Sequence, residues 1–448
     1  MIKDFKNKPR KFFGQKIRGK RVIVMGLGLH GGGVGMVKFL AKQRAKILVT
    51  DLKTKKELKE SIAKLKKYKN KILYILGKHR AEDFKNADLI IKNPGVPKES
   101  KYLQIARKNN VPIETDIGLF FELCPSKKII GVTGTKGKST VATLIAKLLA
   151  TKYHVVLAGN IRTSVLEELP KINKNTVIVL ELSSWQLEDL KPHQKSPHIA
   201  VITNIMPDHL NRYKGMKDYI KAKKLIFKFQ KSEDYLFLNV EDKIVKNFEK
   251  EAAAKTIFYS KEQVKKYKNY IKLLGEHNLN NIAGAVAVAK LFKISDSSIK
   301  KVLSKFYNAE GRLEFIKEYN GIQYYNDTTA TTPEATIAAL NSFPADKKII
   351  LIAGGADKHL NFKELAKEIL KKVKFLILLP GTATKKIEKA SLRLVTRRAK
   401  NMREAVKIAH KNAKKDDIIL LSPGCASFGL FQHEFDRGKQ FQKCIKNL

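Results

Sequence analysis

One loop constrains the fold of this chain more than any other part of its sequence. Residues 133–140 read TGTKGKST and stand between the apolar run KKIIGV and the helix-like run VATLIAKLLA. A phosphate-binding loop requires this strand–loop–helix context, because its glycines let backbone N–H groups turn toward phosphates at a helix N-terminus. Val132 departs from the common pattern, which has a glycine there. We predict a nucleotide-binding α/β domain, with an ordinary glycine turn before a helix as the alternative.

Several side chains supply candidate chemistry for that nucleotide. Lys138 can reach the outer phosphates, and the hydroxyl of Ser139 or Thr140 can bind Mg²⁺. Glu181 ends the apolar run TVIVLE, at the strand position where an acidic residue commonly completes Mg²⁺ coordination. His209 follows a further strand-like run. Each also has a structural explanation when taken alone, for example Glu181 as a helix cap and His209 as a core histidine.

The length of the chain requires more than one core. Single hydrophobic cores stop growing near ~250–300 residues, and this chain has 448. Strand-like apolar runs alternate with turns and helical periodicity, which predicts an α/β architecture with parallel sheets. We expect three domains: a Rossmann-like domain at residues 1–114, a central P-loop ATPase-type parallel-sheet domain at residues 115–309, and a C-terminal Rossmann-like α/β domain at residues 310–448.

A second glycine turn lies in the first of these domains. Residues 26–31 read GLGLHG after a strand-like run, and Asp51 ends the next run. Alone, this pattern suggests a dinucleotide fold and is weak. Because the chain already has a nucleotide loop downstream, we interpret the first domain as the site of a different, nucleotide-bearing substrate whose diphosphate lies near the turn.

The formal net charge of +47 raises the alternative of a nucleic-acid-binding protein. Lysines are spread over the whole sequence and alternate with apolar helical positions, as on solvated helix faces. Arginine, whose bidentate fork suits phosphate recognition, is scarce beside lysine, and no nucleic-acid-binding motif stands out. We expect no specific nucleic-acid partner. Attraction of anionic substrates such as nucleotides is a milder consequence of the charge.

Cysteine usage and hydropathy bear on location. The three cysteines, Cys124, Cys425 and Cys444, are far apart and form no zinc or redox motif, which fits a reducing compartment. The basic N-terminus lacks the apolar stretch of a signal peptide, and no apolar run approaches the ~20 residues that span a bilayer. We expect a cytoplasmic protein without membrane insertion, and a monomer.

Further motifs carry a family resemblance. TGTKGKST, ELSSWQLE, NIMPDHLNRY, YIKAKKLIF, GEHNLNN, GRLE, NDTTAT, GGADK and SPGCAS follow one another in the order seen in Mur ligases, over nearly the whole chain. ELSSWQLE, the GLGLHG turn and NPGVP resemble the D-glutamate-adding branch, whereas the DNPR signature of the diaminopimelate-adding branch is absent. Folylpolyglutamate synthase is a weak competitor, since it shares the central fold but lacks such a first domain.

The resemblance implies an ATP-dependent ligase of peptidoglycan precursor synthesis. In such enzymes ATP phosphorylates the terminal carboxylate of the UDP-linked substrate, and an amino group then attacks the acyl phosphate to give an amide, ADP and phosphate. The implied substrates are UDP-N-acetylmuramoyl-L-alanine and glutamate, and the implied cofactors are ATP and two Mg²⁺ ions. Metal and lysine charge fit this reaction, since negative charge accumulates where two anions meet.

The family motifs also imply roles for individual residues of this sequence. Lys138 would hold the transferring phosphoryl group, Ser139 and Glu181 the first Mg²⁺, and His209 and a carbamylated Lys223 the second. Roles in nucleotide binding are implied for Thr133, Gly134, Thr135, Lys136, Gly137, Lys138, Ser139, Thr140, Asn278, Asn281, Arg312 and Asp327. Roles in binding the UDP part and the muramoyl-alanine part are implied for Leu29, His30, Asp51, Asn93, Gly95, Asn160, Ser183 and Gln186.

The implied amino-acid pocket departs from the family pattern. Thr331, Lys358 and Ser427 match positions that hold the glutamate carboxylates. Thr329, however, stands where the D-glutamate enzymes have lysine, and Glu434 stands where a phenylalanine usually covers the amino acid. A carboxylate near an anionic ligand lowers affinity unless it is paired or turned outward. D-glutamate and L-glutamate therefore both stay open as substrates.

Overall fold

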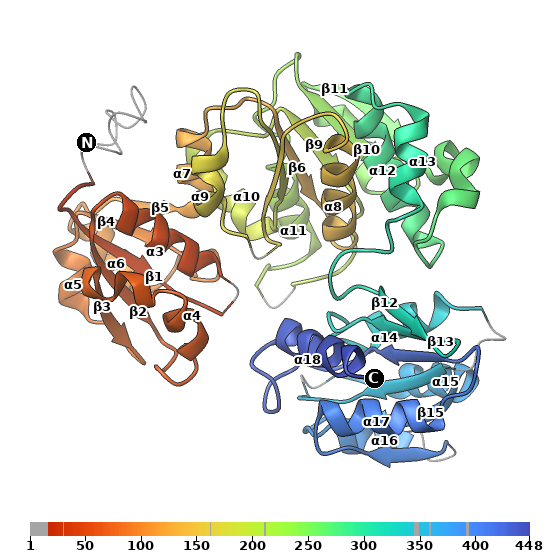
Figure 1. Cartoon of the computed structure of the whole chain (residues 1–448). Coiled ribbons are helices and arrows are strands. Elements are labelled where there is room, and N and C mark those ends of the chain that lie inside the picture. The colour runs from red at the N-terminus through yellow and green to blue at the C-terminus, as the bar shows by residue number, and fades with distance from the viewer. Residues whose placement is uncertain are drawn as a thin grey trace. The chain divides into compact units, whose positions relative to one another are not determined.

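The computed structural model describes residues 17–29, 31–161, 163–209, 212–344, 349–357, 360–390 and 394–448. The chain, which is drawn in Figure 1, forms two compact units. The first unit comprises Met1–Lys266 and Asn280–Ile299, and the second comprises Tyr267–Leu279 and Lys300–Leu448. None of the helices in the described part of the chain combines the length and the apolar character that crossing a bilayer demands.

The first unit begins with a five-stranded parallel sheet of order β3-β2-β1-β4-β5. Its strands are β1 (Arg21–Met25), β2 (Lys46–Asp51), β3 (Ile72–Leu76), β4 (Leu89–Lys92) and β5 (Ile113–Thr115). Its helices are α3 (Gly32–Lys42), α4 (Lys59–Ala63), η1 (Lys66–Lys71), α5 (Ala81–Lys85) and α6 (Lys101–Lys108). The winding of the chain reverses between β1 and β4, and in such sheets ligands bind beyond the carboxyl ends at this switch point.

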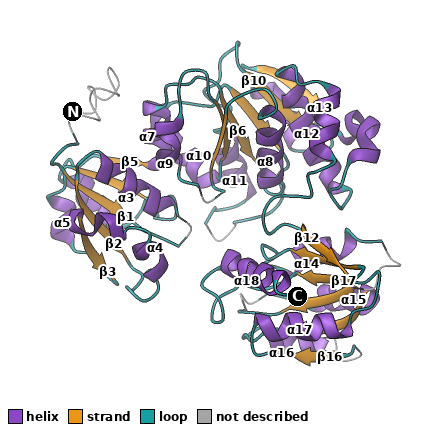
Figure 2. Cartoon of the chain, viewed as in Figure 1, coloured by secondary structure: helices purple, strands orange, loops and turns teal. Residues whose placement is uncertain are grey.

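A six-stranded parallel sheet follows in the same unit, with order β11-β10-β9-β6-β8-β7. Its strands are β6 (Ile129–Thr133), β7 (Val155–Gly159), β8 (Val177–Glu181), β9 (Ile199–Ile202), β10 (Tyr235–Asn239) and β11 (Lys255–Tyr259). Every residue of β6, β8 and β9 is buried, which explains why these strands read as continuous Ile, Val and Leu runs. Figure 2 shows helices on both sides of this sheet.

The helices of this part of the chain place the candidate residues along the sheet. They are α7 (Asp116–Leu123), α8 (Lys138–Leu149), α9 (Val165–Glu168), η2 (Leu169–Lys171), α10 (Ser184–Leu190), η3 (Lys191–His193), α11 (Met216–Lys224), η4 (Val245–Glu251), η5 (Lys261–Tyr270), α12 (His277–Leu291) and α13 (Asp296–Leu303). The helix α8 directly follows the central strand β6, and α11 brings Lys223 toward the end of β6.

Two buried ionic clusters join the first sheet to the second part of this unit. Lys92, the last residue of β4, pairs with Asp189 of α10 at 2.7 Å, and both side chains are about nine-tenths buried. His193 lies 3.2 Å from both Glu114 and Glu122. Burial alone would lower the pKa of His193, but the two glutamates outweigh it and raise that pKa to about 9. The imidazole is therefore a cation at neutral pH.

The second unit holds a mixed six-stranded sheet of order β12-β13-β17-β14-β15-β16. Its strands are β12 (Glu314–Tyr319), β13 (Ile322–Asn326), β14 (Ile349–Ala353), β15 (Val373–Leu378), β16 (Thr396–Arg398) and β17 (Ile418–Leu421), and its helices are α14 (Pro333–Asn341), α15 (Lys363–Lys372), α16 (Thr384–Ala390), α17 (Met402–Asn412) and α18 (Glu434–Lys446). Only the hairpin between β12 and β13 is antiparallel. The predicted α/β class is confirmed, with this hairpin added at one edge.

Candidate active site

The predicted phosphate loop joins β6 to α8, and its backbone requires glycine at two positions. Gly134 has φ 145° and Gly137 has φ 82°, a region that residues with a side chain rarely adopt. A Cβ on Gly134 would lie 1.9 Å from Oγ1 of Thr203, and one on Gly137 would lie 2.2 Å from Oδ1 of Asn281. The loop is therefore packed tightly from behind, which fixes its course and favours a preformed cradle for phosphate.

The N-terminus of α8 fits an anion. Gly137 caps this helix without a side chain, so no N-cap oxygen accepts from the first-turn N–H groups. Nζ of Lys138 donates to the carbonyl oxygen of Thr135 at 2.9 Å, which folds the lysine back over the loop. Backbone donors at a helix N-terminus, together with a lysine above them, are the arrangement that binds phosphate groups.

Ser139 and Glu181 form the part of the site that fits a divalent cation. Oγ of Ser139 donates to Oε2 of Glu181 at 2.6 Å, and Nδ2 of Asn160 donates to Oε1 at 2.9 Å. Glu181 is 1% exposed, and the hydroxyl and the carboxylate together offer the hard oxygen ligands that Mg²⁺ prefers. Three of the predicted site residues thus meet at the ends of β6, β7 and β8.

Lys223 lies beneath the same loop and is not a surface charge. Its Nζ donates to the carbonyl oxygen of Gly134 at 2.9 Å and to Oγ1 of Thr133 at 3.2 Å, and the residue is 2% exposed. Burial and the nearby charge of Lys138 lower the pKa of Lys223 well below its usual value, against the opposing effect of Glu181. A lysine in this position can exist as a neutral amine.

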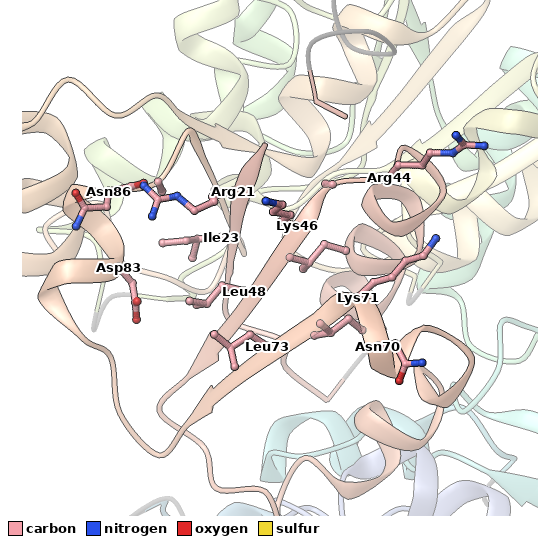
Figure 3. A pocket seen from close by; sticks show the side chains of 14 residues that line it. Arg21, Ile23, Arg44, Lys46, Leu48, Asn70, Lys71, Leu73, Asp83 and Asn86 are labelled. Atoms are coloured by element: carbon pink, nitrogen blue, oxygen red, sulfur yellow. The ribbon is translucent and has the colours of Figure 1, made fainter. Parts of the chain in front are cut away.

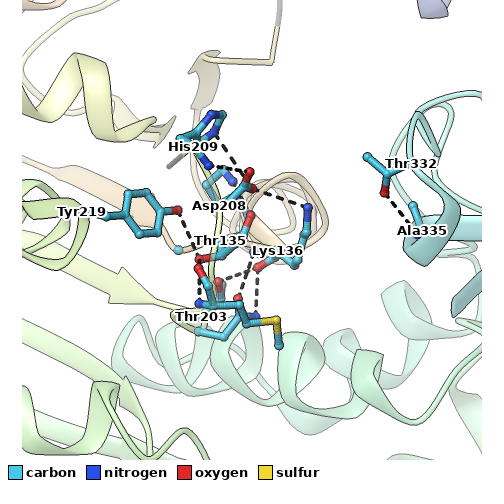
Figure 4. Close-up of polar contacts among 12 residues, drawn as sticks. Thr135, Lys136, Thr203, Asp208, His209, Tyr219, Thr332 and Ala335 are labelled. Atoms are coloured by element: carbon cyan, nitrogen blue, oxygen red, sulfur yellow. Dashed lines mark hydrogen bonds and ion pairs between the residues drawn. The ribbon is translucent and has the colours of Figure 1, made fainter. Parts of the chain in front are cut away.

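His209 stands at the open side of the loop, beside Asp208 (Figure 4). Its backbone has φ 55°, and its side chain is 46% exposed. Burial lowers the pKa of His209, Asp208 opposes this, and nearby lysines lower it further. A neutral imidazole with a free nitrogen can ligate a metal. Asp208 also lies 3.5 Å from Nζ of Lys136, which ties the histidine segment to the loop.

The substrate residues predicted in the first sheet gather at its carboxyl edge. Oδ2 of Asp51 accepts from the N–H of Gly28 at 3.0 Å, which holds the glycine turn against the end of β2. Asn93 directly follows β4, on the other side of the switch point from β1. Its Oδ1 accepts from the N–H of Gly95 at 3.1 Å. Leu29 is half-buried in the turn between them. His30 lies outside the described residues.

Ser183 and Gln186 have a structural role that needs no substrate. Oγ of Ser183 accepts from the N–H of Gln186 at 3.2 Å, and Oε1 of Gln186 accepts from the N–H of Ser183 at 3.1 Å. This reciprocal pair is a capping box at the start of α10. Their proximity to substrate therefore stays a prediction beside this structural explanation.

The second unit brings part of its predicted residues together. Oδ2 of Asp327 accepts from Oγ of Ser422 at 2.8 Å, and Oδ1 accepts from the N–H of Leu313 at 3.1 Å. Burial raises the pKa of Asp327 to about 7, although these hydrogen bonds and Arg312 oppose the rise. Arg312, adjacent to Leu313, is half-buried. Asn278 is buried and donates to the carbonyl oxygen of Leu274 at 2.7 Å.

Two loops implied in amino-acid binding lie side by side in this unit. The N–H of Ala356 donates to the carbonyl oxygen of Ala426 at 2.9 Å, and the reverse bond measures 3.2 Å. Ser427 follows directly and is 4% exposed, whereas Thr331 is half-buried. Lys358 lies outside the described residues.

Comparison with known proteins identifies the chain. Residues 20–115 match the Mur ligase MurD-like N-terminal domain, residues 132–270 the Mur ligase middle domain, and residues 311–425 the Mur ligase glutamate ligase domain. The UDP-N-acetylmuramoylalanine--D-glutamate ligase of Roseiflexus sp. (strain RS-1) is 42% identical over 97% of this chain and 100% of the relative. The chain belongs to the Mur ligase family.

Further matches agree with this assignment. The UDP-N-acetylmuramoylalanine--D-glutamate ligase of Borreliella burgdorferi (strain ZS7) is 39% identical to this Mur ligase over 97% of its chain and 99% of the relative. The solved UDP-N-acetylmuramate-alanine ligase of Thermotoga maritima shares the fold, with a TM-score of 0.64 and 17% identity over 96% of this chain and 99% of that one. The predicted resemblance is confirmed. Members of the family use ATP and Mg²⁺, and the glycine cradle and the Ser139–Glu181 oxygens fit both.

The structure adds residues that the sequence analysis of this Mur ligase missed. The hydroxyl of Tyr219 lies 3.1 Å from Oγ1 of Thr135, and Oδ1 of Asn204 accepts from the N–H of Lys136 at 2.9 Å. Both hold the phosphate loop from segments that are far away in sequence. Asn204 lies within the NIMPDH motif and Tyr219 opens the YIKAKKLIF motif, so both were in quoted motifs, but neither motif indicated the contact with the loop.

Arg437 was also missed, and it bears on the amino-acid pocket. It is fully buried in α18 and donates to Oγ1 and the carbonyl oxygen of Thr328 and to the carbonyl oxygen of Cys425. Burial lowers the pKa of Arg437 to about 10, and Cys425 and Glu434, the latter one turn earlier, oppose this shift. Thr329 donates through Oγ1 to the carbonyl oxygen of Gly311 at 2.9 Å. The unusual carboxylate of Glu434 thus has a buried cation near it.

Proposed function

We propose that this Mur ligase joins D-glutamate to UDP-N-acetylmuramoyl-L-alanine, with ATP, in the synthesis of a peptidoglycan precursor. The single observation that carries the chemistry is the cluster of Lys138, Ser139, Glu181 and Lys223 around one glycine loop. The choice of substrates rests on the full-length similarity to ligases of that name. The UDP part would lie at the carboxyl edge of the first sheet, beside Asp51.

The proposed reaction has two steps. The carboxylate of the alanyl group attacks the γ-phosphorus of ATP, which forms the acyl phosphate and releases ADP. The amino group of glutamate, once it has lost a proton, attacks the acyl carbon, and the amide forms as phosphate leaves. Bound Mg²⁺ would supply positive charge that lowers the repulsion between carboxylate and triphosphate. Lys138 would hold the phosphoryl group that moves, as its place above the loop permits.

The remaining residues have proposed roles in binding. Ser139 and Glu181 would hold one Mg²⁺, and His209 with a carbamylated Lys223 would hold the second. Nucleotide contacts are proposed for Thr133, Gly134, Thr135, Lys136, Gly137, Thr140, Asn278, Asn281, Arg312 and Asp327. Substrate contacts are proposed for Leu29, His30, Asp51, Asn93, Gly95, Asn160, Ser183, Gln186, Thr331, Lys358 and Ser427.

The carbamate of Lys223 follows from charge. An ammonium ion would repel Mg²⁺, whereas a neutral amine can add CO₂ and lose a proton, which gives an anionic oxygen ligand of the kind Mg²⁺ prefers. The burial of Lys223 and the proximity of Lys138 favour the neutral amine.

We also propose the domain division 1–114, 115–309 and 310–448, a monomeric state and a cytoplasmic location.

Phosphate release tests the proposed function. Release should require UDP-N-acetylmuramoyl-L-alanine and D-glutamate together, and L-glutamate, alanine or diaminopimelate should give no more than background. Equal stimulation by alanine or diaminopimelate would reject the substrate assignment. L-glutamate is the second candidate, because Thr329 and Glu434 depart from the pattern of the D-glutamate enzymes. Faster release with the L enantiomer would select it and leave the reaction type intact.

A further inference from the structure

A pocket of about 710 Å³ lies on one face of the first sheet, away from the candidate active site (Figure 3). Its lining includes Arg21 at the start of β1, Lys46 at the start of β2 and Ile72 at the start of β3. The glycine turn and Asp51 lie at the opposite, carboxyl ends of the same strands. The pocket is therefore distinct from the proposed substrate site.

The pocket exists because one face of the sheet is incompletely covered. The crossover between β2 and β3 places Leu58 and Leu65 in the core on the α3 side of the sheet. On the other face, α5 is five residues long, and its Phe84 packs over β1 and β4 with Ile23 and Ile90. No helix in the described part of the chain covers β3 there, and Leu73 is 57% exposed.

The floor of the pocket is an aliphatic row that crosses three strands. Ile23 of β1 is the register partner of Leu48 of β2, and Leu48 is the partner of Leu73 of β3. Adjacent strands lie ~4.8 Å apart, so the row extends for roughly 10 Å. Side chains two residues apart share a face and lie about 6.6 Å from each other along a strand. The next row on this face pairs Arg21 with Lys46, so cations border the aliphatic floor directly.

The rim of the pocket has a surplus of positive charge. The side chains of Arg21 and Lys71 each donate to a backbone carbonyl oxygen, of Asn86 and Ala41 respectively. The side chains of Arg44 and Lys46 are exposed and have no hydrogen bond or ion pair with any residue that the structure describes. These two cations are available to a ligand.

The acidic residue of the lining does not cancel this charge. Both carboxylate oxygens of Asp83 accept from Arg80, at 2.8 Å each. This bidentate pair neutralises Asp83 within its own helix. An apolar ligand would therefore meet an aliphatic floor with uncompensated cations along one side.

We propose that this pocket binds one molecule of a single-chain alkyl phosphate, with the chain on the aliphatic floor and the phosphate beside it at Arg44 and Lys46. The volume falls in the range of roughly 300–1,000 Å³ typical of small-molecule sites, whereas a stable protein partner needs on the order of 1,000 Å² of interface. Residues 1–16 of this chain carry six lysines and arginines against one aspartate, so the rim repels them.

Calorimetric titration of the full chain with dodecyl phosphate, below the concentration at which it forms micelles, tests the proposal. We expect one saturable site. Lys46→Glu should weaken binding about tenfold, because the reversal replaces an attraction with a repulsion. The matched control is Lys59→Glu, which should bind as the parent does, because Lys59 on α4 is also exposed and has no side-chain partner in the described chain. Dodecyl maltoside, a neutral analogue, should bind at least about tenfold more weakly.

A second variant tests the contribution of the aliphatic floor of the pocket to binding. Leu48→Asn should also weaken binding about tenfold, with thermal unfolding and ATP hydrolysis recorded to show that the chain still folds. Equal affinity of the parent and Lys46→Glu for dodecyl phosphate would overturn the proposal, as would equal affinity for the maltoside. Binding only to micelles or to anionic vesicles would assign the surface to a membrane instead. A tenfold gain in affinity on deletion of residues 2–16 would show that this segment is the occupant.

Discussion

Replacing Lys223 with alanine tests the proposed carbamate most directly. The parent Nζ lies 2.9 Å from the carbonyl oxygen of Gly134 and 3.2 Å from Oγ1 of Thr133, in a residue that is 2% exposed. Burial, followed by the charge of Lys138, lowers the pKa of Lys223 well below its usual value. The truncation removes this buried amine, and we expect the rest of α11 to stay in place.

The expected loss can be worked from these observations. An ordinary lysine with a pKa of about 10.4 is neutral in roughly one molecule per thousand at pH 7.4, and each unit by which burial lowers the pKa raises that fraction about tenfold. The neutral amine is the form that adds CO₂. Loss of a group that orients a bound metal commonly lowers metal affinity or activity about 10–100-fold, so loss of a ligand itself should lower turnover at limiting Mg²⁺ by at least about 100-fold.

Phosphate release with both substrates measures the effect of Lys223→Ala, and circular dichroism shows whether the variant folds. Acetate should restore part of the activity by placing a carboxylate in the vacated space. Lys224→Ala is the matched control, because Lys224 pairs with Glu251 at the surface, where an ion pair contributes about 1 kcal/mol or less. Near-normal turnover of Lys223→Ala, or greater damage from Lys224→Ala, would refute the reasoning. A ¹³C-carbamate signal after bicarbonate labelling should appear in the parent and be absent from Lys223→Ala.

Three further predictions concern the loop and the ionic cluster. Lys138→Ala should lower turnover by at least about 100-fold in the phosphate assay, because the amine that would hold the moving phosphoryl group is removed, and urea unfolding should show that the variant still folds. Gly137→Ala should destabilise the fold in urea by more than Gly19→Ala. Both glycines have positive φ (82° and 75°), which costs a residue with a side chain about 1–2 kcal/mol. At Gly137 the new Cβ would in addition lie 2.2 Å from Oδ1 of Asn281, whereas at Gly19 it would meet no atom within 4 Å. The pKa of His193 is about 9 in the folded chain and 6.5 ordinarily, so its stabilisation should be complete below pH 6.5 and be lost as the pH rises through 9. His193→Gln should flatten this pH dependence of the free energy of unfolding in urea. The same pH dependence in the parent and the variant would contradict the prediction.

Local sequence patterns could predict the central features of the site because parallel strands deliver their carboxyl ends to one edge. Ser139 and Glu181, 42 positions apart, were both predicted as Mg²⁺ ligands, and their side chains lie 2.6 Å apart. The support of the loop by Tyr219 could not be predicted, since a tyrosine on an amphipathic helix carries no mark of the hydroxyl contact that it makes. The antiparallel strand β12 also escaped prediction, because the run Glu314–Tyr319 mixes charged and apolar residues without a fixed alternation.

The open face over β3 lay beyond sequence reasoning for a different reason. Leu48 and Leu73 belong to ordinary apolar strands, and the exposure of Leu73 depends on which side of the sheet each crossover takes. That choice is a property of the packed chain and leaves no signal in either strand.

The ion pair between Lys92 and Asp189 limits which first sheets can be exchanged into this enzyme without loss of stability. A chimaera that exchanged only the first sheet for that of a relative would leave Asp189 buried without its cationic partner if the incoming strand lacked a lysine at its end. An unpaired buried charge of this kind destabilises a protein by about 3–5 kcal/mol, a large part of the stability of a typical domain. Recombination and domain-grafting experiments should therefore treat Lys92 and Asp189 as one inherited pair, even though Lys92 falls in the match to the family's N-terminal domain and Asp189 in the match to its middle domain.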